Sequence, residues 1–188
     1  IQVDGKLSEW KDAKWINLGH SSLFAEGTKW DGPSDSSGEI ALQWDEDGLY
    51  LAARVVDDKP IMNLKRRKFV WDGDALEMTL STNPRANVNR TEFESGDFQI
   101  GLSAGNGDAN PPIIWIWQND EVATEGEIHV EPIHSPKGYS LEAKIPWKAL
   151  GSYHPRSGDA LGFNIALDDG DGGGRKSQLV WAGDFAFY

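Results

Sequence analysis

A tryptophan and a carboxylate stand close together in the segment FVWDGDALEMTL, which runs from Phe69 to Leu80. Trp71 offers a flat apolar plate, and Glu77 offers oxygens that accept hydrogen bonds from hydroxyl groups. A pyranose ring matches both, because it has a face of C–H groups and a rim of hydroxyls. The pair therefore predicts sugar recognition. The alternative is that Trp71 only closes the end of a β core, since buried tryptophan is common in β proteins.

Alternation of apolar and polar residues predicts the strands that position these side chains. Leu76 and Met78 point to one face, so Glu77 lies on the opposite face of the same strand. The segment 98–102 repeats this arrangement with Gln99 pointing outward. We therefore expect Glu77 and Gln99 to face away from the core.

The same alternation recurs along the chain, and no window keeps a helical period for more than about two turns. A hairpin is expected around the acidic turn 45–48, and one helical turn is expected at 147–150. About eight to ten short strands with Gly-rich and Asp-rich turns predict an all-β fold, an antiparallel β-sandwich with a jelly-roll-like or immunoglobulin-like two-sheet architecture. A length of 188 residues fits one domain, residues 1–188.

Charge and composition limit the classes of molecule that this chain is expected to bind. Lys and Arg number 18 against 30 Asp and Glu, which gives a net charge of −12. Nucleic acid and anionic membranes are therefore poor partners, whereas neutral ligands and cations remain. The chain has no cysteine, which excludes disulfides, thiolate metal sites and a cysteine nucleophile. It has no apolar run long enough to span a bilayer and no basic-then-apolar leader, so we expect a mature soluble domain or an excised piece of a longer protein.

Two acidic turns have the composition of cation sites. Asp57 and Asp58 follow one predicted strand, and Asp168, Asp169 and Asp171 follow another. Calcium binds several oxygen ligands on flexible turns of this kind. Neither turn completes an EF-hand, and the alternative is that both are solvated. The expected cofactor is structural calcium, with no organic cofactor.

Catalysis is not expected. Asp74 and Glu77 could be read as the acid and the nucleophile of a glycosidase, which needs two carboxylates ~5 to 10 Å apart. Alternation places the two on different sides of the strand. The four histidines show neither metal spacing nor the spacing of a catalytic triad. Trp115 and Trp117 share a face and are expected to be core rather than a flat binding platform.

Several segments, in order along nearly the whole chain, resemble the family 9 carbohydrate-binding modules and their close relatives. The segments that carry the resemblance are Val3–Trp10, Leu42–Leu51 with Val55–Asp58 behind it, Trp71–Glu77, Glu142–Gly151 and Gly162–Ile165. The resemblance implies a β-sandwich that binds cellulose, xylan or soluble sugars between two tryptophans, often with structural calcium. Related sandwiches bind haem instead.

The resemblance also assigns side chains. Trp71 matches one plate of the clamp, Glu77 a hydrogen-bonding carboxylate, and Gln99 a further polar contact. Asn164 is expected on the same outer face. The resemblance does not assign the second aromatic side chain of the clamp. The candidates for it are Trp30, Phe185 and Tyr188.

The sequence therefore predicts non-catalytic carbohydrate binding by a targeting module of a larger, secreted polysaccharide-acting protein. The expected partner is a polysaccharide or oligosaccharide. The alternative is a haem-binding electron-transfer domain, whose axial ligands would be Met62 or Met78 with a histidine. Met78 alternates into the core, which weakens this alternative.

Overall fold

The computed structural model describes residues 1–20, 22–24, 28–87, 89–119, 121–122, 126–134 and 136–183. In this part of the chain the regular structure is β apart from short 3-10 turns. The strands are β1 (Trp15–Leu18), β2 (Leu23–Phe24), β3 (Ser36–Trp44), β4 (Gly48–Asp57), β5 (Ala75–Ser81), β6 (Asp97–Ser103), β7 (Ile113–Ile116), β8 (Glu121–Val122), β9 (Glu127–His134), β10 (Lys137–Pro146), β11 (Gly162–Asp169) and β12 (Ser177–Val180). The turns are η1 (Leu7–Trp10), η2 (Arg67–Phe69), η3 (Trp117–Asn119) and η4 (Trp147–Leu150).

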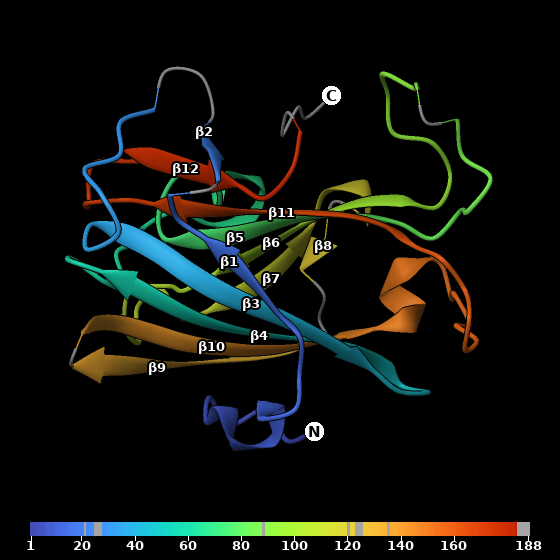
Figure 1. Ribbon diagram of the computed structural model, residues 1–188, viewed down its shortest axis with the longest axis horizontal. Helices are drawn as coiled ribbons and strands as arrows, with labels where there is room; N and C mark the ends of the chain where they lie inside the picture. Colours follow the sequence, from blue (N-terminus) through green and yellow to red (C-terminus); the bar gives the residue numbers. More distant parts are fainter. Residues whose placement is uncertain are drawn as a thin grey trace.

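The strands form two antiparallel sheets that pack face to face (Figure 1). Sheet A has five strands in the order β1-β3-β4-β10-β9. Sheet B has seven strands in the order β2-β12-β11-β5-β6-β7-β8. The predicted antiparallel β-sandwich is therefore confirmed, and so is the helical turn after β10, which is η4.

The core lies between the sheets and is built from alternate residues of the central strands. Ile40 and Leu51 from sheet A and Leu76, Met78 and Ile100 from sheet B are fully buried there. The period-two pattern of β5 is thus confirmed. It leaves the residue between Leu76 and Met78 on the outer face of sheet B.

Trp115 and Trp117 do not share one strand in the structure, because β7 ends at Ile116 and Trp117 begins η3. Trp115 is buried as expected, but it pairs with Gly101, which in turn pairs with Glu77. It therefore lies on the outer face of sheet B and not between the sheets. Apolar residues, Trp115 among them, therefore cover part of this outer face beside Glu77.

A buried carboxylate attaches the N-terminal segment to the outer face of sheet A. Glu142 on β10 is 1% exposed and accepts hydrogen bonds from the Trp10 indole (2.6 Å) and from the backbone N–H groups of Asp4 (3.0 Å) and Gly5 (2.7 Å). Trp10 packs in a small apolar cluster with Tyr50 on this face. Glu142 therefore fixes both the backbone and the indole of this segment.

Replacing Glu142 with alanine should lower the free energy of unfolding by about 2 to 3 kcal/mol, because two buried donors and one partly buried donor lose a charged acceptor. Urea unfolding followed by tryptophan fluorescence measures the change. Glu142→Gln keeps an acceptor oxygen and should lose less. Equal losses in the two variants would contradict the role of the carboxylate.

Candidate functional site

The outer face of sheet B presents Glu77 in the middle of small side chains. Glu77 on β5 pairs with Gly101 on β6 and with Ala166 on β11. Gly101 has no space for a larger residue, because a Cβ there would lie 2.5 Å from Val70 Cγ2 and 2.9 Å from the Trp117 ring. The residues that pair directly with Glu77 are therefore too small to bind its carboxylate. Its hydrogen-bond partners are side chains from other positions.

Four polar side chains surround this carboxylate. Gln99 Nε2 donates to Glu77 Oε2 at 3.2 Å, and Gln178 Nε2 donates to Glu77 Oε1 at 3.0 Å. Arg175 Nη1 lies 3.3 Å from Glu77 Oε1 and 3.1 Å from Asp168 Oδ1, which also accepts from Gln178 at 2.9 Å. We call these five residues the outer-face network. It joins strands β5, β6, β11 and β12.

The charge balance of the network rests on Arg175. Burial raises the pKa of Glu77, which is 1% exposed, and raises the pKa of Asp168, which is 0% exposed, well above its usual range. The guanidinium opposes both shifts. Arg175 is therefore the positive charge that stabilises the ionised forms of both carboxylates against the effect of burial.

Arg175 also covers the indole of Trp71. Its guanidinium carbon lies 4.8 Å from the centre of the Trp71 ring, which is a cation–π contact. The arginine is held there by its own backbone, because Arg175 N donates to Asp72 Oδ1 at 2.8 Å. Lys65 forms an ion pair with the other oxygen of Asp72. Trp71 is half-buried, and Arg175 links it to Glu77.

The structure thus joins Trp71 to Glu77 through Arg175, and Gln99 to Glu77 directly. Sequence reasoning missed Arg175 and Gln178. Gln178 could have been found, because the alternation of β12 places it on the outer face beside Asp168. Arg175 lies in a glycine-rich loop without a period, and nothing local indicates its contact with Trp71.

Other predicted site residues have different surroundings. The Asn164 side chain donates to the carbonyl of Ala182 and accepts from its N–H, so it holds the chain after β12. Trp30 packs against the core, and its indole donates to the Ser36 carbonyl at 2.7 Å. Phe185 and Tyr188 lie outside the described residues.

A second feature is a buried acidic group between the sheets. Carboxylate oxygens of Asp57, Asp74 and Asp169 all lie within 4.8 Å of one another, and all three residues are buried. Asp57 ends β4 in sheet A and Asp169 ends β11 in sheet B, so the group spans the sandwich. We call it the inner acidic group. Asp74 belongs to it and not to the site of Glu77, so the two do not form a catalytic pair.

The inner acidic group has little compensation for its charge. Burial and neighbouring carboxylates raise the pKa of Asp57 and of Asp169 to about 7, and burial raises the pKa of Asp74 to about 6. No lysine or arginine of the described chain forms an ion pair with any of the three. Asp169 Oδ1 is buried and has no hydrogen-bond partner. This donor set fits a cation.

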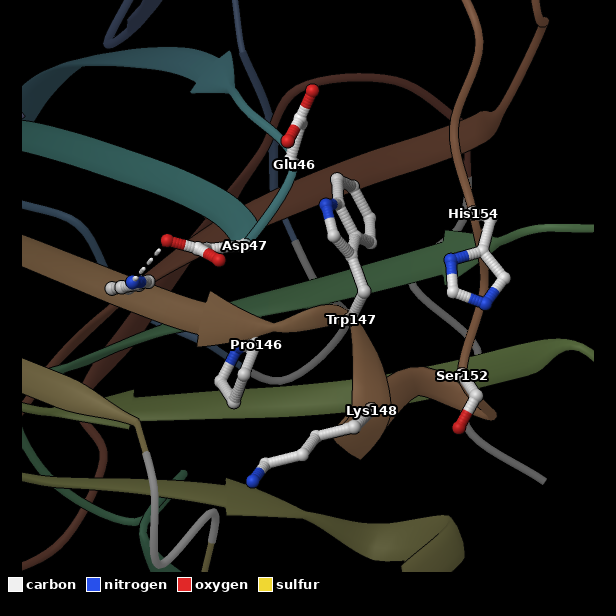
Figure 2. A pocket seen from close by; sticks show the side chains of 8 residues that line it. Glu46, Asp47, Pro146, Trp147, Lys148, Ser152 and His154 are labelled. Atoms are coloured by element: carbon white, nitrogen blue, oxygen red, sulfur yellow. Dashed lines mark ion pairs between the residues drawn. The ribbon is translucent and has the colours of Figure 1, made fainter.

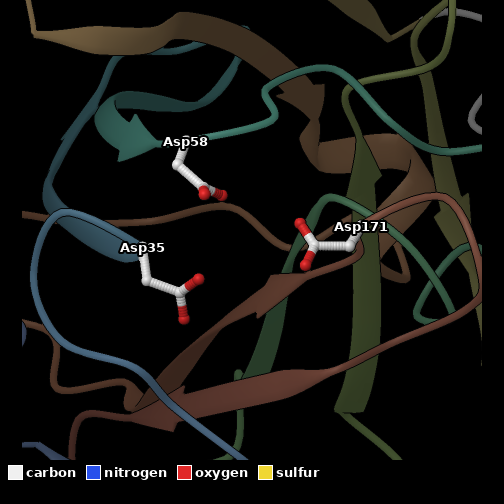
Figure 3. A group of neighbouring side chains, drawn as sticks. All are labelled: Asp35, Asp58 and Asp171. Atoms are coloured by element: carbon white, nitrogen blue, oxygen red, sulfur yellow. The ribbon is translucent and has the colours of Figure 1, made fainter.

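In a neighbouring acidic group, lysines already pair with two of the three carboxylates. Asp35, Asp58 and Asp171 point toward a common space (Figure 3). Lys176 Nζ lies 2.5 Å from Asp35 and 3.3 Å from Asp171, and Lys59 Nζ lies 3.1 Å from Asp171. We call this trio of aspartates the outer acidic group. The lysines therefore balance the charge of two of its three carboxylates, those of Asp35 and Asp171.

The predicted metal residues are therefore divided. Asp57 and Asp169 lie in the inner acidic group, Asp58 and Asp171 lie in the outer one, and Asp168 lies in neither, because it faces Glu77. The sequence analysis did not include Asp35 and Asp74.

The proposed haem alternative gains no support from the structure, because Met78 is buried in the apolar core. Among the residues described, no helix is long and apolar enough to cross a membrane.

The raised pKa values predict how stability depends on pH. The pKa values of Asp57 and Asp169 are about 7 in the folded chain, against an ordinary 3.8. The folded state therefore binds more protons, and the stabilisation that these groups provide is complete below pH ~3.8 and is lost as the pH rises through ~7. Urea unfolding in EDTA between pH 5 and pH 8 should show this decline, and Asp169→Asn should reduce it. An equal decline in both proteins would contradict the assignment.

Comparison with known proteins identifies the family. The family described as "Carbohydrate family 9 binding domain-like" matches residues 3–184, and the chain belongs to it. Two solved structures are similar over 99% of this chain, both of a family 9 carbohydrate-binding module from Caldicellulosiruptor kristjanssonii. The one in complex with cellotriose has a TM-score of 0.69 at 18% identity over 82% of that chain. The one in complex with glucose has a TM-score of 0.68 at 17% identity over 83% of that chain.

Two curated relatives are xylanases of much greater length. Endo-1,4-beta-xylanase C of Paenibacillus barcinonensis is 25% identical over 183 residues, which are 96% of this chain and 14% of the xylanase. Endo-1,4-beta-xylanase A of Thermoanaerobacterium saccharolyticum is 22% identical over 185 residues, which are 95% of this chain and 13% of the xylanase. The chain therefore spans only a small part of the relatives that it matches.

Proposed function

We propose that this domain binds carbohydrate without catalysis, on the outer face of sheet B. The observation that carries the proposal is the half-buried Trp71 beside the buried carboxylate of Glu77, with Arg175 on both. An indole plate next to hydrogen-bonding groups suits the two faces of a pyranose. Similar structures of this family were solved with cellotriose and glucose, which supports a β-glucan ligand.

Arg175 occupies the surface that the sugar would use. Carbon atoms in contact lie ~3.5 to 4 Å apart, so a sugar ring cannot enter between Trp71 and a guanidinium 4.8 Å away. The arginine must therefore leave the indole when the sugar stacks. The cation–π contact itself is worth only about 0.5 to 1 kcal/mol, whereas loss of the ion pairs with the buried Glu77 and Asp168 would cost more. The guanidinium therefore moves off the ring but stays within reach of these carboxylates.

The network then provides the polar contacts. When Arg175 moves, Glu77 Oε1 keeps the hydrogen bond from Gln178 and can accept a sugar hydroxyl. Gln99 holds the other oxygen of Glu77 and orients the carboxylate. The displaced guanidinium remains beside the ligand as a further donor.

We also propose that the domain targets a larger, secreted polysaccharide-acting protein to its substrate. The support is that it matches a small part of two endo-1,4-β-xylanases. Xylan is therefore a second ligand class to test.

Trp71→Ala should weaken cellotriose binding at least about ten-fold, because the loss of the stacking contact adds to the loss of apolar contact area. Isothermal titration calorimetry measures the affinity. Trp181→Ala is the matched control, since Trp181 is 43% exposed and packs on Phe163. Equal affinity of Trp71→Ala and the parent would refute this site.

For the inner acidic group we propose a structural calcium ion held by Asp57, Asp74 and Asp169. A divalent cation would supply the positive charge that three buried carboxylates lack. The support is their proximity, their burial and the unpartnered oxygen of Asp169. The ion would join sheet A to sheet B.

Calcium should raise the melting temperature at pH 7.5 by about 5 to 10 °C at one hundred times its Kd, relative to EDTA. The rise should shrink at pH 5, where protons compete. Asp169→Asn should abolish the response, and Asp58→Asn, in the outer acidic group, should keep it. Melting curves that are the same in calcium and in EDTA at pH 7.5 would rule the ion out.

A further inference from the structure

A tryptophan lies exposed at the end of the sandwich opposite to the acidic groups. Ile40 and Trp44 fall on the same, inner face of β3, yet Ile40 is 0% exposed and Trp44 is 49% exposed. Trp44 pairs with Leu49 at the last rung of the β3–β4 hairpin. Asp57, at the other end of this hairpin, pairs with Ser36, which is roughly 25 Å from Trp44 along β3.

Trp44 forms one wall of a hollow of about 180 Å³. The other walls come from η4 and from the loop that follows it. Residues of this lining that matter for recognition are the aromatic Trp147 and Tyr153 and the polar Arg156, Ser157 and Asp159. The lining thus combines an exposed indole with charged and hydroxyl groups.

The walls are held in place by specific contacts. Trp147 Nε1 donates to the carbonyl of Asp45 in the hairpin turn at 2.9 Å, and the Trp147 and Tyr153 rings meet edge to face at 5.7 Å. Tyr153 OH and the backbone N–H of Arg156 both donate to Asp159 Oδ2 at 2.9 Å. The hairpin and the loop are therefore fixed relative to each other before any ligand arrives, which lowers the entropic cost of binding.

Polar groups at the rim remain available. In the part of the chain that the structure describes, neither Asp159 Oδ1 nor the guanidinium of Arg156 nor the hydroxyl of Ser157 forms a hydrogen bond. One carboxylate and one guanidinium balance each other, so the rim suits a neutral ligand. The net charge of −12 on the whole chain disfavours an anionic one.

We propose that this hollow is a second carbohydrate-binding site, which takes one sugar unit of a neutral polysaccharide. The unit stacks on Trp44, and its hydroxyls bond to Asp159 and Arg156. The volume is below the ~300 to 1,000 Å³ of pockets for drug-sized ligands, which matches a single sugar unit. The site does not depend on Trp71.

A wider hollow adjoins this site and shares Trp147 with it. It has a volume of about 510 Å³, and Figure 2 shows that Glu46, Asp47, Lys148, Ser152 and His154 surround it. Its polar lining suits the hydroxyls of the next units of the same polysaccharide chain. Two sites on one domain would bind a polymer more tightly than they bind a short sugar.

The test is a titration of the whole domain, with its tryptophan indoles labelled with ¹⁵N, using cellotriose and xylotriose. Tryptophan-to-phenylalanine variants assign the signals of Trp44, Trp71 and Trp181. The Trp44 signal should shift and saturate with a Kd on the order of millimolar, both in the parent and in Trp71→Ala. The Trp181 signal should not move, and the dispersion of the other indole signals shows that each variant is folded.

No movement of the Trp44 signal at tens of millimolar of either sugar would overturn the site. A shift that disappears in Trp71→Ala would overturn it too, because the shift would then be transmitted from the first site. Movement of Trp44 without movement of Trp71 would support this second site and refute the first. Retention on insoluble cellulose should fall at least about five-fold in Trp44→Ala if the site adds to polymer binding.

Discussion

Two consecutive aspartates at the end of β11 set the main constraint on this domain. Alternation sends Asp168 to the outer face of sheet B and Asp169 into the space between the sheets, and both are buried. A buried carboxylate is costly unless it is paired, protonated or bound to a metal. Asp168 meets Arg175 on the outer face. Asp169 meets Asp57 and Asp74 inside, where a proton or a cation must balance the charge.

The loop that follows β11 connects the surroundings of these two aspartates to the candidate sugar site. Its residue Arg175 is tied to Asp72 by the backbone and lies on Trp71, while the next residue, Lys176, reaches the outer acidic group through Asp35. One short loop therefore carries the cation that covers the indole and the cation that balances the neighbouring carboxylates.

The parts of this arrangement that depend on local geometry could be predicted from the sequence. Period-two alternation placed Glu77 and Gln99 outward because it needs only the pleat of one strand. The contact of Arg175 with Asp72 joins residues 103 positions apart, and no local pattern encodes it. The grouping of Asp169 with residues of other strands likewise depends on how the two sheets close. Adjacency in sequence suggested one metal site for both aspartates of β11, whereas alternation separates them.

The proposed sugar site requires that a sugar replaces Arg175 on the face of Trp71. A crystal structure of the domain with cellotriose tests this directly. We expect one sugar ring to lie parallel to the Trp71 indole, with a hydroxyl bonded to Glu77 and the guanidinium of Arg175 moved off the ring. A complex in which Arg175 still covers Trp71 and the sugar binds elsewhere would contradict the account.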